Sequence, residues 1–262
     1  MRPHVAAVYA FARAADDIAD EGSAPPEERQ ARLRVWQDRV HRAAAGHIAD
    51  TAAADRDELI GLALGQTIRL LDLPLPLFDD LLSAFGQDTM TTRYASWADV
   101  FDYCRRSANP VGRLVLRIAG YRDDGLDRSS DGLCTALQLT NFWQAFGRDW
   151  RAGRLYVPRD AVVLNRAREM DLAGAMLSGE WLAVFDRCIA ITRERFAAGR
   201  AVCDGVRGRL RQKLRLTWLG GARMLDYVED AAPYLLYHRP TLGVRDVPAL
   251  LWRAWTWAPN AS

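Results

Sequence analysis

Apolar residues recur every three to four positions along almost the whole chain, which is the period of an amphipathic helix. No pair of alternating apolar and polar runs is joined by a hairpin signal, so the pattern favours an all-α fold. Pro25 and Pro26 fit the first turn of a helix that continues through RQARLRVWQDRVHRAA. The other predicted helices cover residues 3–22, 55–72, 76–86, 97–120, 129–152, 179–207, 209–230 and 246–257.

Proline, glycine and acidic residues interrupt this pattern at PLP (74–76), DDG (123–125) and HRPTLG (238–243). Because no internal repeat, low-complexity tract or long linker occurs, we predict one helical domain over residues 1–262. Pro110 falls inside the predicted helix 97–120, where it removes an intrahelical hydrogen bond. Two interpretations stay open: a break between two helices, or a kink that bends the wall of a cavity.

Composition narrows the class of protein. Of 262 residues, 50% are hydrophobic and 26% are charged, as in soluble globular proteins. A net charge of +2 with scattered arginines excludes a strong general attraction to nucleic acid. The start MRPHVAAVYAFARAADDIADE is interrupted by charge, so no cleaved leader is expected. A reduced, cytoplasmic protein is expected, because the cysteines form no CxxC pair: Cys104, Cys134, Cys188 and Cys203.

A first polar stripe lies near the amino terminus. Tyr9, Arg13, Asp16 and Asp20 follow i, i+4, i+7, i+11 spacing and therefore share one face of a helix. The two carboxylates repel each other, and Asp17 adds to the repulsion. A bound cation would relieve it, and magnesium prefers such oxygen ligands together with substrate phosphates. The alternative is an acidic, solvated helix end.

A second stripe repeats this pattern. Gln138, Asn141, Ala145 and Asp149 lie on one face of a helix that is otherwise rich in Leu, Phe and Trp and is expected to be largely buried. Buried polar groups need partners. Two stripes facing each other across a bundle would hold a magnesium and diphosphate unit.

Two arginines could contribute to such a site. Arg13 and Arg154 are candidates to bind phosphate oxygens. A position of Arg154 on the surface fits the spacing equally well.

The chain resembles the squalene and phytoene synthase family in the segments DDIAD, YCRRSANPVGR, LQLTNFWQ followed by Asp149, and GRLYVP, in this order. Within the family, LTWLGGARMLDYVE and RPTL are most similar to the hydroxysqualene synthase branch. The resemblance implies an all-α isoprenoid synthase bundle with a central cavity and Mg²⁺-dependent ionisation of a prenyl diphosphate. In that branch presqualene diphosphate is the substrate in hopanoid biosynthesis, water captures the cation, and NADPH is not expected.

The resemblance also implies roles for single residues. Asp16 and Asp20 match the first aspartate motif, and Asn141 and Asp149 match polar positions of the second, so these four would bind metal and, with Tyr103, be catalytic. The positions that would hold diphosphate or line the cavity are Tyr9, Arg13, Gln138, Arg154 and Tyr156.

Two departures from the family pattern stand out. Ala145 occupies the position of an expected aspartate ligand, through natural drift or deliberate mutation. The chain also begins only eight residues before Tyr9, whereas family members carry an earlier segment that closes one side of the pocket. We expect that segment to be absent here.

Three functions are therefore compared. The first is a hydroxysqualene synthase. The second is a relative that condenses two farnesyl diphosphates or prenylates another acceptor. The third is a catalytically degenerate protein that binds lipid or supports a partner enzyme, which Ala145 favours. Trp252, Trp255 and Trp257 add a further alternative, because they suit either core or homodimer packing or peripheral membrane contact.

Overall fold

The computed structural model describes residues 1–20, 24–47 and 55–258, with Asp20 described in its backbone only. Over these residues the chain is helical, and the extended pairing that occurs is one isolated bridge between Arg93 and Leu155. The predicted all-α class is confirmed. The chain divides into two compact units, residues 1–91 with 105–122 and residues 92–104 with 123–262. That both belong to one domain stays a prediction.

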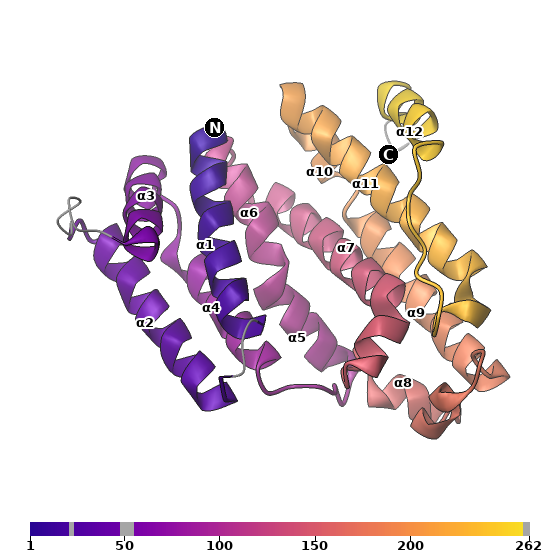
Figure 1. The fold of residues 1–262 in the computed structure, drawn as a ribbon. Coiled ribbons are helices and arrows are strands. Elements are labelled where there is room, and N and C mark those ends of the chain that lie inside the picture. The colour runs from indigo at the N-terminus through magenta and orange to yellow at the C-terminus, as the bar shows by residue number, and fades with distance from the viewer. Residues whose placement is uncertain (21–23, 48–54, 259–262) are drawn as a thin grey trace. The chain divides into compact units, whose positions relative to one another are not determined.

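The first unit contains α1 (Arg2–Asp20), α2 (Pro26–Ala44), α3 (Arg56–Leu71), α4 (Leu75–Asp88) and α6 (Asn109–Ile118), with α1 packed against α2, α3 and α4 (Figure 1). Phe11 is fully buried at its centre. Its ring stacks on Trp36 at 6.1 Å and meets Phe78 edge-on at 5.4 Å. Because this apolar side of α1 faces the core of the first unit, the opposite side of α1 points away from that core.

The predicted helix 97–120 is two helices, α5 (Trp97–Ser107) and α6. Pro110 lies in the first turn of α6, where its missing N–H costs no hydrogen bond. The interpretation as a break is confirmed, and the interpretation as a kink within one helix is wrong.

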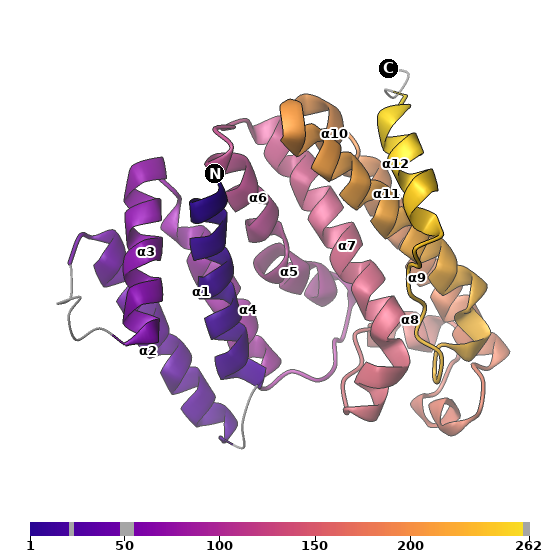
Figure 2. The same ribbon diagram turned by 45° about the horizontal axis from the view of Figure 1, so that its top comes forward.

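The second unit is built on α7 (Asp124–Arg151), which packs against α9 (Gly179–Ala198) and α11 (Gly208–Asp230) (Figure 2). Gly199 allows the close approach of α9 to α7, because a Cβ there would lie 2.4 Å from the Leu133 backbone nitrogen. The buried Trp143 indole donates a hydrogen bond to Thr192 Oγ1 at 2.9 Å. The smaller elements are α8 (Arg159–Leu164), η1 (Glu169–Ala173), α10 (Val202–Gly205), η2 (Ala232–Tyr234) and α12 (Asp246–Trp255).

Most helix boundaries lie within two residues of the prediction, and the exceptions have local causes. The helix expected from residue 129 begins at Asp124, because Asp123 caps it by accepting a hydrogen bond from Leu126 N at 2.7 Å. The helix expected over 179–207 ends at Ala198 and resumes as α10. The end of the helix predicted over 3–22 falls partly outside the described residues, since α1 is described to Asp20.

Candidate functional site

The outward face of α1 carries the first predicted stripe. Tyr9 is 70% exposed, and Arg13 and Asp16 lie on the same side of the helix. Arg13 Nη1 donates to Asp16 Oδ2 at 3.1 Å, and its Nη2 lies 2.6 Å from Asp17 Oδ1. The guanidinium thus relieves part of the repulsion between the carboxylates. The side chain of Asp20 lies outside the described part of the chain.

The second stripe lies along α7. Gln138, Asn141, Ala145 and Asp149 share one face by their spacing in this continuous helix. The expectation of a largely buried helix is wrong at Asn141, which is exposed, and Asp149 is only partly buried. Ala145 is 1% exposed. The polar stripe therefore borders solvent at its ends while its middle position is enclosed.

Asp149 lies among three arginines. Burial raises the pKa of its carboxyl above the ordinary value, and the charges of Arg148, Arg154 and Arg239 act in the opposite direction without outweighing burial. Arg148 forms an ion pair with it, with Nη2 3.2 Å from Asp149 Oδ1. The Arg154 N–H donates to the Asp149 carbonyl oxygen at 2.8 Å, so the end of α7 positions both residues. Arg154 is partly buried, and its role as a phosphate ligand stays a prediction.

Arg239 approaches this carboxylate because its segment is attached to α7. A Cβ on Gly147 would lie 2.1 Å from the Leu236 carbonyl oxygen, so only glycine permits this contact. Arg151 donates to the same carbonyl oxygen, and Gln144 Nε2 donates to the Pro240 carbonyl oxygen at 2.8 Å. Arg239 was not among the predicted site residues, although the RPTL motif that contains it was a usable signal.

Four rings, those of Tyr94, Tyr103, Phe142 and Tyr156, form a group that we call the aromatic cluster. Phe142 and Tyr156 stack at 3.9 Å, and Tyr103 lies 6.2 Å from Tyr156 and 6.0 Å from Phe142. Tyr94 completes it, at 5.7 Å from both tyrosines. Two predicted residues, Tyr103 and Tyr156, are thus brought together, whereas the sequence analysis did not identify Tyr94 and Phe142 as site residues.

The backbone around the cluster is fixed by pairing between two distant segments. Leu155 N donates to the Thr92 carbonyl oxygen and Arg159 N donates to the Tyr94 carbonyl oxygen, both at 2.9 Å. Arg93 adds an ion pair with Glu169 and a hydrogen bond to the Gly153 carbonyl oxygen at 2.6 Å. The GRLYVP segment is therefore held in a defined position beside the cluster.

Each compact unit thus contains part of the predicted site. Tyr9, Arg13 and Asp16 lie in the first unit, and the α7 stripe, Arg154, Tyr103 and Tyr156 lie in the second. Their meeting across a cavity stays a prediction. Among the described side chains, no three acidic, histidine or cysteine groups converge as a metal site would require. The donors available, carboxylate and amide oxygens, nevertheless suit magnesium in their chemistry.

The cysteines do not form part of this site. None of the four forms a disulfide. Burial raises the pKa of Cys104 and of Cys203 to about 12, so neither is a thiolate at neutral pH.

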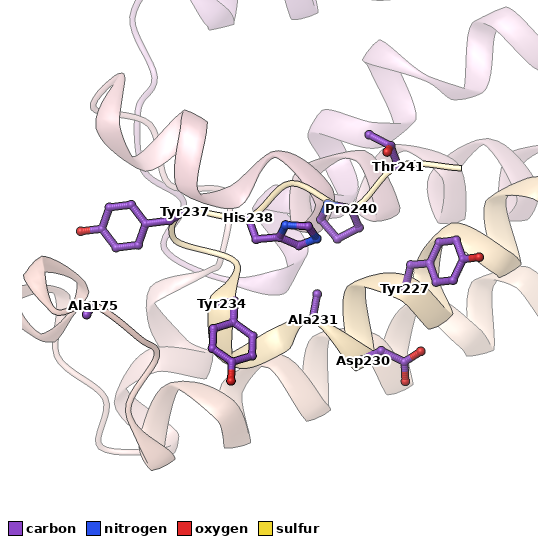
Figure 3. Close-up of a pocket in the computed structure, with 9 residues that line it drawn as sticks. All are labelled: Ala175, Tyr227, Asp230, Ala231, Tyr234, Tyr237, His238, Pro240 and Thr241. Atoms are coloured by element: carbon purple, nitrogen blue, oxygen red, sulfur yellow. The ribbon is translucent and has the colours of Figure 1, made fainter. Parts of the chain in front are cut away.

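A separate groove of about 700 Å³ lies between the end of α11 and the chain that follows it (Figure 3). None of the predicted site residues lines it. One of its tyrosines has a structural role, since the Tyr227 hydroxyl donates to Asp246 Oδ1 at 2.6 Å. The lining residues are Ala175, Tyr227, Asp230, Ala231, Tyr234, Tyr237, His238, Pro240 and Thr241.

The fold is similar to those of solved structures, including the following two. Squalene synthase HpnC from Alicyclobacillus acidocaldarius superimposes with a TM-score of 0.80 at 35% identity, covering 88% of this chain and 84% of that one. A dehydrosqualene synthase in complex with ligand superimposes with a TM-score of 0.82 at 20% identity, covering 97% and 86%. The latter similarity shows the fold alone.

Sequence comparison agrees. The chain is 38% identical over 173 residues to the hydroxysqualene synthase of Zymomonas mobilis, covering 65% of this chain and 54% of that protein. It is 34% identical over 182 residues to the hydroxysqualene synthase of Sinorhizobium fredii, covering 69% and 58%. The match thus spans little more than half the length of these relatives. The model of the squalene/phytoene synthase family matches residues 1–246, and the chain belongs to this family.

Proposed function

We propose that this protein is a magnesium-dependent synthase that converts presqualene diphosphate and water to hydroxysqualene and diphosphate in hopanoid biosynthesis. The observation that carries the choice of substrate is its similarity to two hydroxysqualene synthases, at 38% and 34% identity. The charge pattern around Asp149 and the nearby aromatic cluster support a reaction that separates an anionic leaving group from a cation.

The residues divide into those for metal and those for diphosphate. Asp16, Asp20, Asn141 and Asp149 would hold magnesium. When bound, magnesium would neutralise the charge of the leaving diphosphate. Asp149 is suited to this role, because its carboxylate is poorly solvated and would gain from a cation.

The diphosphate would be bound by arginines, whose planar forks match its oxygens. Arg13 and Arg154 are proposed for this role, and the position of Arg239 near Asp149 adds a third. These guanidinium groups would stabilise the negative charge that develops as the C–O bond breaks. Tyr9 and Gln138 are proposed as further substrate contacts.

The aromatic cluster would act on the other product of ionisation. Tyr103 is buried and Tyr156 is partly buried, so their rings offer an environment with little water. Electron-rich ring faces attract cations within about 6 Å of the ring centre. They would protect the rearranging carbocation until one water molecule is captured, and that water would release its proton to diphosphate or solvent. This reaction requires no NADPH.

Two alternatives have specific support. The chain is 27% identical over 194 residues to the 15-cis-phytoene synthase of Synechococcus elongatus, which favours condensation of two prenyl diphosphates or transfer to another acceptor. Ala145 favours a degenerate lipid-binding or partner protein, since it removes one oxygen ligand. The expected cytoplasmic location and homodimer also stay predictions. Among the helices described, none is both long and apolar enough to span a membrane.

The experiment compares products from presqualene diphosphate with those from farnesyl diphosphate alone, each with magnesium or with EDTA. We expect hydroxysqualene from presqualene diphosphate, dependence on magnesium, and loss of product in Asp16→Asn. The matched control is Asp38→Asn, which removes an exposed carboxylate from α2. Product from farnesyl diphosphate alone would instead support condensation. If neither substrate is consumed, even by Ala145→Asp, the degenerate reading is correct.

A further inference from the structure

Another pocket of the second unit, of about 590 Å³, lies beside α8 and the paired segments 92–95 and 155–160. We call it the α8 pocket. Seven of its ten lining residues are apolar or aromatic, and the other three are charged. Pockets of this size with mainly apolar walls and a few polar groups are typical of sites for small molecules. The aliphatic wall of the α8 pocket consists of Ala95, Leu155, Val157, Val162, Val163 and Ala167.

The α8 pocket is distinct from the site proposed for substrate. Leu155 and Val157 line it, whereas Tyr156 between them is directed to the aromatic cluster, where it stacks on Phe142 at 3.9 Å. Tyr94 belongs to both the pocket wall and the cluster. None of the residues proposed to bind metal or diphosphate lines the pocket. A ligand of the α8 pocket would therefore not occupy the positions proposed for metal and diphosphate.

Two of the three charged lining residues neutralise each other. Arg93 Nε donates to Glu169 Oε1 at 3.1 Å, and the Arg93 guanidinium also donates to the Gly153 carbonyl oxygen at 2.6 Å. The same guanidinium lies 5.7 Å from the centre of the Trp150 ring. Arg93 and Glu169 are therefore fixed parts of the wall, and together they carry no net charge.

Arg159 is the third charged lining residue, and its side chain is available to a ligand. Its backbone N–H donates to the Tyr94 carbonyl oxygen at 2.9 Å, which fixes the start of α8. The residue is exposed, and its guanidinium forms no hydrogen bond or ion pair within the described ranges 1–20, 24–47 and 55–258. The neighbouring Asp160 accepts a hydrogen bond from Trp97 N at 3.3 Å and does not line the pocket. The α8 pocket thus combines an aliphatic wall with one unpaired positive charge.

We propose that the α8 pocket binds a fatty acid anion, with the alkyl chain on the aliphatic wall and the carboxylate at Arg159. Removing methylene groups from water supplies the affinity of the chain. A guanidinium matches a carboxylate through two parallel hydrogen bonds. The proposal thus uses both features of the pocket, its aliphatic wall and its single free guanidinium.

A prenyl diphosphate is the other candidate ligand, and charge argues against it. A diphosphate group carries more negative charge than one guanidinium can neutralise, whereas a carboxylate carries a single charge. The site proposed for substrate differs in this respect, because the charges of Arg148, Arg154 and Arg239 all act on Asp149 there. The single free arginine of the α8 pocket therefore favours a carboxylate.

The test is isothermal titration calorimetry of the full chain with decanoate and with 1-decanol, which has the same alkyl chain without the charge. We expect decanoate to bind more tightly than octanoate, by up to about fourfold per methylene group. Arg159→Gln should weaken decanoate binding about two- to fivefold, as expected for an exposed ion pair, and leave decanol binding unchanged. Arg159→Lys retains the charge and should retain most of the affinity for decanoate.

Val163→Asp tests the aliphatic wall. Val163 lines the pocket and is 64% exposed, so a carboxylate there stays solvated in the fold. It should weaken decanoate binding at least fivefold, through repulsion and loss of apolar contact. The matched control is Leu164→Asp, because Leu164 is the next residue of α8, is 77% exposed and does not line the pocket. It should bind decanoate nearly as the parent does at about 0.15 M salt, which screens exposed charges beyond about 8 Å.

Thermal unfolding shows whether each variant is folded. The proposal is overturned if the parent binds no decanoate, or if folded Arg159→Gln and Val163→Asp bind it as the parent does. Displacement of decanoate by inorganic diphosphate with magnesium would place decanoate in the site proposed for substrate and would also overturn it. Binding of farnesyl diphosphate without magnesium that is tighter than that of decanoate and requires Arg159 would assign the pocket to a diphosphate. None of these measurements uses turnover, so their outcome is independent of the proposed function.

Discussion

Ala145→Asp restores the carboxylate that the second stripe lacks, and its consequences can be worked out in both stability and rate. Ala145 is 1% exposed, so a carboxylate introduced there would be poorly solvated. The effective penalty for burying an unpaired charge is several kcal/mol. A loss of 1 kcal/mol lowers the Tm of a domain of this size by about 2–4 °C. In EDTA, we therefore expect the variant to unfold well below the parent.

Magnesium should reverse this loss if the new carboxylate faces a metal. A ligand present at 100 times its Kd stabilises the folded state by about 2.7 kcal/mol, which corresponds to roughly 5–10 °C. The parent should respond less, since it has one ligand fewer. Residues that hydrogen-bond to metal ligands contribute about 10–100-fold to activity, and a direct ligand should contribute at least as much. Turnover should therefore rise by at least this factor, which corresponds to a reduction of the barrier by about 1.4–2.7 kcal/mol.

The assay is single-turnover release of diphosphate from presqualene diphosphate, combined with thermal unfolding in magnesium and in EDTA at equal folded concentration. Ala145→Leu is the control, because leucine has a similar shape to aspartate without an oxygen atom that could bind metal, and it should show neither the metal-dependent Tm nor the gain in rate. If Ala145→Asp and Ala145→Leu behave alike in the metal dependence of Tm and in rate, position 145 does not face metal, and the reasoning from the missing ligand is refuted.

Three other predictions follow from single contacts. Arg13→Ala should weaken diphosphate binding at least tenfold in equilibrium dialysis. It should lower Tm by only a few degrees, because the exposed ion pairs of Arg13 with Asp16 and Asp17 contribute about 1 kcal/mol or less. A large fall in Tm with unchanged affinity would make Arg13 a structural residue. Asp149→Asn should raise Tm at pH 7 without magnesium, since burial raises the pKa of Asp149 and disfavours its charged form in the fold. The gain should shrink as the pH falls and disappear below the pKa of an ordinary aspartate, about 3.9, where the carboxyl is protonated in both states. A gain that persists at pH 3 would assign it to packing. Gly147→Ala should lower the free energy of unfolding by about 1–3 kcal/mol through overpacking, because its Cβ would meet the Leu236 carbonyl oxygen. It should also weaken diphosphate binding by displacing Arg239. An unchanged Tm would contradict the close contact.

The fold could be predicted from the sequence where periodicity and local chemistry agree. Phe11 and its neighbours mark the buried side of α1, and this also predicts the outward stripe of Tyr9, Arg13 and Asp16. Pro110 indicated an irregularity but not its form, since proline is compatible with both a kink and a first turn. The break was decided by where α5 ends.

The candidate site was less accessible to sequence reasoning, because its parts come from segments distant in the chain. The approach of Arg239 to Asp149 depends on the close contact at Gly147 and on hydrogen bonds donated by the side chains of residues 144 and 151. The apolar period of a helix predicts neither kind of contact. Tyr94 joins the aromatic cluster only because residues 92–95 pair with residues 155–160. The short elements α8, η1 and η2 lack enough turns to show a period.

The proposed function requires a metal and diphosphate site formed by the two polar stripes. The decisive measurement is a crystal structure with Mn²⁺ in place of magnesium and a nonreactive thiodiphosphate analogue of the substrate, with the metal located by anomalous scattering. We predict manganese bound by oxygens of Asp16, Asp20, Asn141 and Asp149, with Arg13, Arg154 and Arg239 on the diphosphate. Metal and diphosphate bound elsewhere, with the α1 and α7 stripes on separate outer surfaces, would contradict the proposed function.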